Sequence, residues 1–371
     1  MNPSSQFCHN PVCSVYGQVG LGNIRVFSHK EARYYCNRCG EPFAATKGTP
    51  LYRRRTAPET IALVLTLLAH GCPLQAIVVA FGYDERTVAD WQRAAGGHCE
   101  QFDAHVQRLH PIDVGHAQAD EISVKTVGGR LWMALAIAVP SRFWLGGVLG
   151  ETRKLPLLLA IVGRIRAWAR HPAILICVDG LAGYPEAVRR VFRRPVHTGK
   201  VGRPRLEPEK GWMLGQVVKE YAKRRVVSVT QRIVQGSAAA IARVLAATGG
   251  GTQINTSYIE RLNATFRSVL APLVRRGRAL ARMRETLQAG MYLVGCVYNF
   301  CTYHESLRLP APKGSGRKWI ERTPAMAAGI TEERWEMIHL LSYPVPPAPK
   351  PAKRRRRRTE AVPAAGRRLA A

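Results

Sequence analysis

The chain has 371 residues, a hydrophobic content of 46% and a formal net charge of +30. This length suggests roughly two or three domains, and this hydrophobic content excludes a wholly disordered protein. Lys and Arg outnumber Asp and Glu by 55 to 25, so the expected partner is a polyanion, with nucleic acid ranked ahead of an anionic membrane surface.

The N-terminal segment MNPSSQFCHN is polar and lacks the apolar stretch of a secretory signal. The longest apolar stretch, 131–150, is interrupted by Pro140, Ser141 and Arg142, which favours two strands around a turn over a membrane span. Nine cysteines in a long chain without such a signal argue against a disulfide framework. We therefore expect a cytoplasmic, nucleoid-associated protein without a membrane anchor.

Four cysteines of the N-terminal region have the spacing C-x4-C-x22-C-x2-C. Two such pairs can supply the four soft ligands of a tetrahedral zinc ion, and Gly40 suits the tight turn after the second pair. The alternative is four unrelated reduced thiols, and His9 is a less favoured substitute for the first cysteine. We predict that residues 1–55 form a zinc ribbon. Its ligands would be Cys8, Cys13, Cys36 and Cys39.

Residues 56–100 are predicted to form a helix-turn-helix DNA-binding domain. Thr56 and Glu59 fit a capping box at the first helix, and Asp84 is a suitable N-cap for the candidate recognition helix. The alternative is a small structural helical bundle, but the neighbouring ribbon and the net charge favour DNA binding. The side chains expected to face DNA are Arg86, Thr87, Gln92 and Arg93.

A connector is expected over 101–115, followed by a large α/β domain over 116–343. Strand-like residues 117–127 precede two further apolar strands, a helix over 154–170 and a buried strand that ends on Asp179. Three antiparallel strands, a crossover helix and a fourth, parallel strand are the opening of a ribonuclease-H-like (RNase-H-like) fold. We therefore predict a mixed sheet flanked by helices.

The region after Asp179 contains a basic loop and then an alternating pattern that predicts a β-hairpin. We interpret residues 193–235 as an insertion that contacts DNA or another protomer. The segment 287–301 is apolar nearly all round, which indicates a buried helix. Residues 344–371 are rich in Pro and then in Arg, so a disordered basic tail is expected there.

Three acidic residues lie on predicted elements in an arrangement typical of metal-dependent phosphoryl transfer. Asp120 lies on the first strand of the α/β domain, Asp179 ends the fourth, and Glu260 opens an amphipathic helix. Such carboxylates can hold two hard cations, one beside the attacking oxygen and one beside the leaving oxygen. Arg267 lies two helical turns past Glu260 on the same face and could hold a DNA phosphate, although a solvated side chain is the commoner case.

Each acidic residue also has an ordinary explanation. Asp120 has a rival in Glu121, and the alternation along the strand does not settle which of them faces the site. Asp179 could belong to a strand-end turn, and Glu260 could close a capping box that begins at Ser257. Their combination, on suitable elements in a suitable order, favours the catalytic interpretation.

Three segments of the chain resemble a known family: NTSYIERLNATFRSVLAPLVRRGRALAR, MYLVGCVYNFCTYHESLR and RTPAMAAGI. They are similar to the catalytic domains of bacterial insertion-sequence transposases of the DDE type, above all those with an N-terminal zinc ribbon and helix-turn-helix. The likeness extends from Cys8 to about Pro346, and the block around Glu260 is its most specific part.

The resemblance implies that Asp120, Asp179 and Glu260 bind two Mg²⁺ or Mn²⁺ ions in an RNase-H-like fold. Arg267 matches the basic residue often found seven positions after the Glu. The implied activity is cleavage at transposon ends followed by strand transfer. The implied partners are double-stranded DNA, as terminal inverted repeats and target, and further copies of the chain, with no small-molecule cofactor. The alternatives are a nuclease of the same fold and a non-catalytic DNA-binding regulator.

Overall fold

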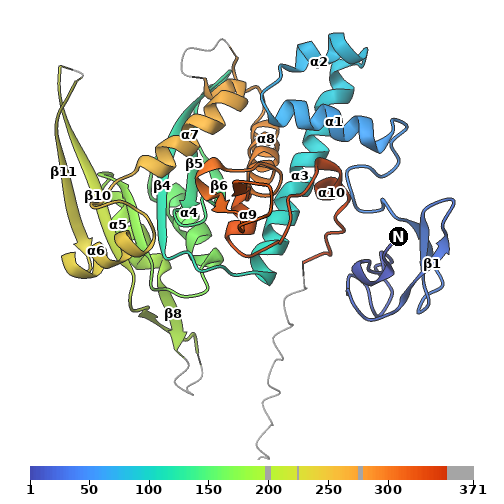
Figure 1. Ribbon diagram of the computed structural model, residues 1–371, viewed down its shortest axis with the longest axis horizontal. Helices are drawn as coiled ribbons and strands as arrows, with labels where there is room; N and C mark the ends of the chain where they lie inside the picture. The colour runs from blue at the N-terminus through green and yellow to red at the C-terminus, as the bar shows by residue number, and fades with distance from the viewer. Residues whose placement is uncertain (197–201, 224, 275–278, 349–371) are drawn as a thin grey trace, which may run out of the picture.

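The computed structural model describes residues 1–196, 202–223, 225–274 and 279–348 (Figure 1). Six strands build its main sheet: β4 (His116–Thr126), β5 (Gly129–Ala138), β6 (Trp144–Gly150), β7 (Leu175–Asp179), β10 (Met213–Ala222) and β11 (Arg225–Gln235). Their order across the sheet is β11-β10-β7-β4-β5-β6. The neighbours β10, β7 and β4 run parallel, whereas the other pairs are antiparallel.

The mixed α/β class that was expected from the sequence is confirmed. The strands β4, β5 and β6 form an antiparallel meander, α4 (Leu155–Trp168) crosses over, and β7 then pairs parallel to β4. Because β5 and β6 are buried along most of their length, they read in the sequence as apolar runs.

Helices cover both faces of the sheet. Neighbouring residues of a strand point to opposite faces, and in β6 a side chain at Gly146 would meet Arg164 of α4, whereas one at Gly147 would meet Met291 of α8 (Arg284–Cys296). With α4 lies α5 (Gly183–Val191), and with α8 lies α7 (Ser257–Val269). The smaller elements are α6 (Ala238–Ala247), β12 (Leu309–Pro310), β13 (Trp319–Ile320), α9 (Pro324–Ala327) and α10 (Met337–Ser342).

The predicted connector over 101–115 is wrong for its first nine residues. They continue α3 (Glu85–Leu109), which follows α1 (Pro58–Ala69) and α2 (Leu74–Phe81). Phe102 is fully buried and lies edge-on to Phe300, with 5.1 Å between the ring centroids. Gly96 packs so closely on the backbone of Ala289 in α8 that no side chain would fit. The predicted helix-turn-helix region therefore shares one hydrophobic core with the sheet.

The caps of these helices agree only in part with the expectation. The Asp84 side chain accepts a hydrogen bond from the Arg86 backbone N–H at 2.8 Å, as predicted for an N-cap. The capping box at Thr56 and Glu59 is wrong, because α1 has Ala57 as its N-cap without a side-chain bond. Pro58 takes the first helical position, which its fixed backbone angle favours.

The interpretation of 193–235 as an insertion is also wrong in its central part. Two short strands, β8 (Arg193–Val196) and β9 (Arg205–Pro208), do form a separate hairpin. However, β10 pairs parallel to β7 and belongs to the main sheet. Its residues Leu214 and Val217 are buried, which anchors this strand in the core. The exposed part of the hairpin is β11, which forms the sheet edge at the left of Figure 1.

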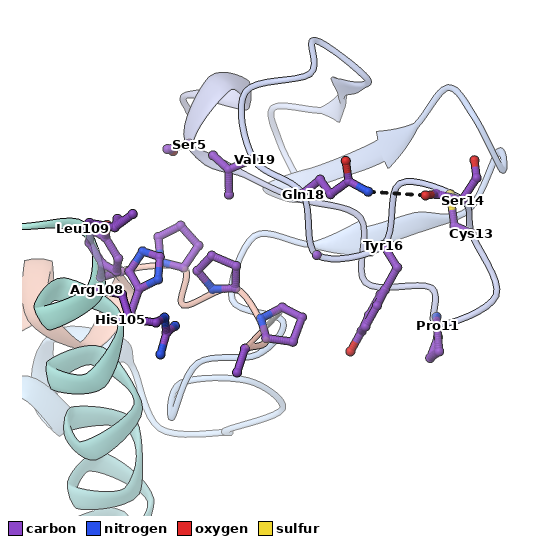
Figure 2. A pocket seen from close by; sticks show the side chains of 16 residues that line it. Ser5, Pro11, Cys13, Ser14, Tyr16, Gln18, Val19, His105, Arg108 and Leu109 are labelled. Carbon is purple, nitrogen blue, oxygen red and sulfur yellow. Dashed lines mark hydrogen bonds between the residues drawn. The ribbon is translucent and has the colours of Figure 1, made fainter. Parts of the chain in front are cut away.

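The first 55 residues form a small three-stranded sheet of β1 (Ile24–Ser28), β2 (Arg33–Cys36) and β3 (Pro42–Ala44). A cleft of about 1140 Å³ separates this ribbon from the end of α3, with Tyr16 and Val19 on one side and His105 and Arg108 on the other (Figure 2). Pro344, Pro346, Pro347 and Ala348, from the start of the predicted tail, line the same cleft. The rest of that tail, 349–371, lies outside the described residues.

Within the described part of the chain, no helix is both long enough and apolar enough to cross a membrane.

The fold predicts an acid-dependent loss of stability through His116, the first residue of β4. Its ring is fully buried, and burial, followed by the charge of Arg142, lowers the pKa of His116 to about 3. Between these pH values His116 is protonated in the unfolded chain but not in the folded chain. The free energy of unfolding therefore falls as the pH drops from 6.5 towards 3. Relative to His116→Gln, wild type should lose about 1.4 kcal/mol of unfolding free energy per pH unit in this window.

Urea denaturation between pH 7 and pH 5 measures this difference. The exposed His171, changed to Gln, is the matched control and should follow the wild-type curve. Parallel curves for wild type and His116→Gln would contradict the prediction.

Candidate functional site

The structure brings the three predicted acidic residues around one cavity of about 380 Å³. Asp120 comes from β4 and Asp179 from the end of β7, two neighbouring parallel strands. Glu260 comes from the first turn of α7, which packs on β4 and β5. Two cations, Arg153 and Lys219, line the same cavity.

Asp120 and Glu121 point to opposite faces of β4, as neighbouring strand residues must. Asp120 lines the cavity and accepts a hydrogen bond from Asn263 Nδ2 at 2.8 Å. The Glu121 side chain is completely buried and accepts hydrogen bonds from Arg153 Nε at 2.7 Å and from the Tyr184 hydroxyl. A Glu121 oxygen lies within 4.8 Å of ligand atoms of Asp120 and Asp179, but its partners already satisfy it. The geometry therefore favours Asp120 over Glu121 as the ligand.

The carboxylates around the cavity lie close together, so a nearby cation would stabilise their charged forms. Burial raises the pKa of Asp120 to about 6, and the nearby charges of Glu121 and Asp179 add to this rise. Arg153 provides such a charge by joining Glu121 to Asp179. Carboxylate oxygens are the ligands that Mg²⁺ and Mn²⁺ prefer, so the residues present fit such an ion.

Glu260 is held by contacts that differ from those of a capping box. It accepts hydrogen bonds from Lys219 Nζ at 2.9 Å and from Thr256 Oγ1 at 3.0 Å. The capping box that would begin at Ser257 does not form, because the helix already starts at Ser257 and has Thr256 as its N-cap. The carboxylate thus points towards β10 and the cavity.

The N-terminus of α7 is capped by a residue that sequence reasoning missed. Gln118 is fully buried, and its Oε1 accepts hydrogen bonds from the backbone N–H groups of Tyr258 and Ile259, both at 3.0 Å. Its Nε2 donates to the Asn255 carbonyl at 2.8 Å. Gln118 precedes Asp120 by two residues and shares its face of β4, so it ties the Asp120 strand to the Glu260 helix.

Asp179 has a comparable support. Gln216 of β10, also fully buried, donates from Nε2 to the backbone carbonyls of Asp179 and Leu181, both at 3.1 Å. Neither glutamine belongs to a motif. The one sequence signal was a polar residue inside an otherwise apolar strand.

The residues predicted to contact DNA differ in their location and exposure. Arg267 does not line the acidic cavity and instead borders a separate pocket of about 220 Å³ with Lys125 and Arg130. On α3, Arg86 and Arg93 are exposed, and Arg93 lies 3.7 Å from Asp90. The remaining two predicted contacts, Thr87 and Gln92, are half-buried.

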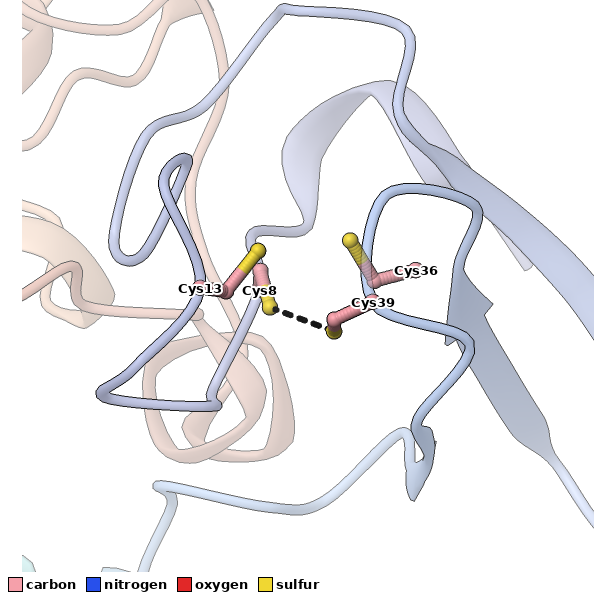
Figure 3. Close-up of side chains that lie close together, drawn as sticks. All are labelled: Cys8, Cys13, Cys36 and Cys39. Atoms are coloured by element: carbon pink, nitrogen blue, oxygen red, sulfur yellow. Dashed lines mark hydrogen bonds between the residues drawn. The ribbon is translucent and has the colours of Figure 1, made fainter.

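The four predicted zinc ligands converge in the ribbon (Figure 3). Their sulfur atoms lie within 4.8 Å of one another, and Cys8 Sγ is 3.7 Å from Cys39 Sγ. A tetrahedral site with Zn–S bonds of about 2.3 Å requires sulfur atoms about 3.8 Å apart. Gly40 has the positive φ of 72° that the tight turn after the second pair requires. The cluster therefore fits a structural metal such as zinc.

The surroundings act differently on two of these thiols: burial raises the pKa of Cys8, whereas the pKa of Cys36 is lowered. Burial opposes ionisation of Cys36, but hydrogen bonds from the Asn23 side chain and from the backbone of Arg38 and Cys39 outweigh it and lower the pKa of Cys36 to about 7. His9 is not in the cluster. Its ring is half-buried and lies 4.3 Å from the ring centroid of Phe7.

A scan against protein-family models finds no match for this chain, and a search of curated proteins finds none either.

The ribbon should lose its metal when one ligand is removed. We expect Cys36→Ser to lower the zinc content from about one ion per chain to well below that value, because three thiolates hold the ion less tightly. Elemental analysis of purified protein measures this. Cys72→Ser, outside the cluster, should keep its zinc, and an unchanged zinc content in Cys36→Ser would contradict the assignment.

The affinity of the acidic cavity for Mn²⁺ should respond differently to substitution of Asp120 and of Glu121. Asp120→Asn is expected to weaken Mn²⁺ binding, measured by calorimetry on the full chain, by about 100-fold. Glu121→Gln should change Mn²⁺ binding by less than about tenfold but lower the unfolding free energy by about 1–3 kcal/mol, since it weakens the buried bonds to Arg153 and Tyr184. The reverse pattern of Mn²⁺ affinities would assign the ligand to Glu121.

Proposed function

We propose that this protein is a transposase of the DDE type, which cuts DNA at transposon ends and joins those ends to target DNA. The observation that carries the proposal is the meeting of Asp120, Asp179 and Glu260 around one cavity. An RNase-H-like fold is supported by the strand arrangement, in which an antiparallel meander is followed by two parallel strands on the side of the first strand.

The three carboxylates would hold two Mg²⁺ or Mn²⁺ ions. Bound there, the ions would supply Lewis acidity, which makes the attacking oxygen more nucleophilic and stabilises the leaving oxygen. Asn263 and Arg153 would orient Asp120 and Asp179 through the hydrogen bonds described above. Lys219, which contacts Glu260 beside the cavity, would approach a DNA phosphate once the carboxylate turns to a metal ion.

The reaction would need no covalent bond between enzyme and DNA. Water attacks a backbone phosphorus at the transposon end, a phosphorus–oxygen bond breaks, and a free 3′-OH is released. That hydroxyl then attacks a phosphorus of the target, forming one ester bond as another breaks, so the number of phosphodiester bonds is conserved in the joining step. Buried, preorganised carboxylates suit this chemistry because little reorganisation is required.

DNA-end recognition is assigned to the N-terminal part of the chain. The ribbon and the α1–α3 region lie on one side of the catalytic core in Figure 1, and Arg86 and Arg93 are exposed on α3. A net charge of +30 would strengthen binding to any DNA through phosphate contacts. Assembly of several copies on two DNA ends is part of the same proposal.

The test is cleavage and joining of DNA that carries the ends of the element, with Mg²⁺, by wild type, Asp179→Ala and Glu260→Ala. We expect joined products from wild type and a loss of about 1000-fold or more in both variants, with end binding retained, because the variants remove metal ligands and not DNA contacts.

Glu186→Ala, which removes a half-exposed carboxylate of α5 outside the cavity, is the matched control and should remain active. Cleavage without joining in wild type would replace the proposal with a nuclease. Tight end binding without cleavage would replace it with a DNA-binding regulator.

A further inference from the structure

A second pocket lies on the other side of α7 from the acidic cavity. It has a volume of about 220 Å³ and is lined by Ile137, Arg142, Tyr258, Arg261, Leu262, Thr265, Tyr298, Thr302 and His304. Tyr258, Arg261, Leu262 and Thr265 follow one another at helical spacing and so form one face of α7. Glu260 and Asn263 belong to the face that meets the acidic residues. One helix therefore serves two sites.

The lining of this pocket carries two cationic side chains within a mainly apolar surface. It contains the guanidinium groups of Arg142 and Arg261 and no acidic residue. Neither arginine forms an ion pair with any acidic residue in the part of the chain that the structure describes. Glu305 follows His304 in the chain, but it pairs with Arg308 at 3.2 Å and its side chain is 84% exposed.

The backbone around the pocket is irregular at two independent places. Arg142 has a φ of 57°, a left-handed conformation that is uncommon for a residue with a side chain. Its guanidinium lies 4.0 Å from the ring centroid of Tyr258, so the charged group is stacked and fixed. Tyr298 lies in a π-helical turn, Val297–Cys301, a deformation that is frequent at functional sites. Arg142 and Tyr298 both line the pocket.

Two ionisable side chains of the pocket, Tyr298 and His304, are held in their neutral forms by their surroundings. Burial raises the pKa of the Tyr298 hydroxyl, so it keeps its proton. The pKa of His304 is lowered by burial and by the charges of Arg142 and Arg261. An anion in the pocket would offset the repulsion between these two arginines.

We propose that this pocket binds a phosphodiester group of the DNA backbone. Two guanidinium groups match the charge and the oxygen atoms of a phosphate, and the Tyr298 hydroxyl lies in the same lining. The hydroxyls of Tyr258, Thr265 and Thr302 already donate to backbone carbonyls. A DNA backbone is favoured over free phosphate because α7 supplies residues both to this pocket and to the acidic cavity on its opposite face. The proposal rests on the proposed function for its choice of DNA as the ligand. It adds a contact that holds the strand beside the cleaved bond.

The test measures the affinity of the full chain for a fluorescent DNA duplex, without added divalent cation, over a range of salt concentrations. Arg142→Gln and Arg261→Gln should each weaken binding about tenfold at low salt and reduce the slope of log K against log salt by about 0.9, the value for one lost phosphate contact. Arg261 is exposed, so its replacement leaves the fold intact even if Arg142→Gln does not. Arg243→Gln, an exposed arginine on α6, removes the same charge and should keep the wild-type slope.

A second measurement replaces single backbone phosphates of the duplex with neutral methylphosphonates. At one position wild type should lose about tenfold in affinity, whereas Arg142→Gln should lose nothing further. Equal losses in both proteins would overturn the proposal.

Inorganic phosphate tests the alternative source of the same chemistry. If it raises the melting temperature of wild type but not of Arg142→Gln, while the salt slopes for DNA are identical, the pocket is a site for free anions and the DNA proposal is overturned. If wild type does not cut DNA but the arginine variants show the expected change in salt slope, the pocket binds DNA and the proposed transposase function is wrong. If cutting and joining proceed in Arg142→Gln and Arg261→Gln with unchanged slopes, only the pocket proposal falls.

Discussion

The candidate site depends on one buried side chain, the amide of Gln118. Three backbone groups converge on it, the carbonyl of Asn255 and the N–H groups of Tyr258 and Ile259. A buried amide is costly unless its donors and acceptors are matched, and here both ends are matched. Because the bonds join the first strand of the sheet to a helix about 140 residues later, they convert two distant parts of the chain into one rigid unit. The spacing between Asp120 and Glu260 follows from that unit.

Charge compensation is the second constraint. In a chain of net charge +30, the cavity gathers carboxylates. Burial, and after it the charges of Glu121 and Asp179, raises the pKa of Asp120. Arg153 and Lys219 balance them from within the protein. A metal ion would therefore compete with these cations for Asp179 and Glu260. The affinity of the site for a metal is then a difference between two sets of favourable interactions, and it is lower than the number of carboxylates alone suggests.

The sequence allowed the strands, the order β4 to β7 and the cysteine cluster to be anticipated, because apolar runs and cysteine spacing are local signals. It could not settle Asp120 against Glu121, since alternation alone does not say which face is buried, and the bonds of Glu121 to Arg153 and Tyr184 are long-range. Gln118 and Gln216 were missed for the same reason. The insertion was misjudged because a hairpin pattern does not reveal that β10 also pairs with β7.

The continuity of α3 has a mechanical consequence. Its 25 residues run without a break from the exposed Arg86 to the core contact at Phe102 and beyond. A helix of this length spans about 37 Å, close to the rise of about 11 base pairs of B-form DNA. With no hinge along it, such a helix acts as a ruler. On the proposed function, the distance between the sequence that is recognised and the bond that is cut would be set by the geometry of one protein element, and insertions or deletions of a few base pairs between them would not be absorbed.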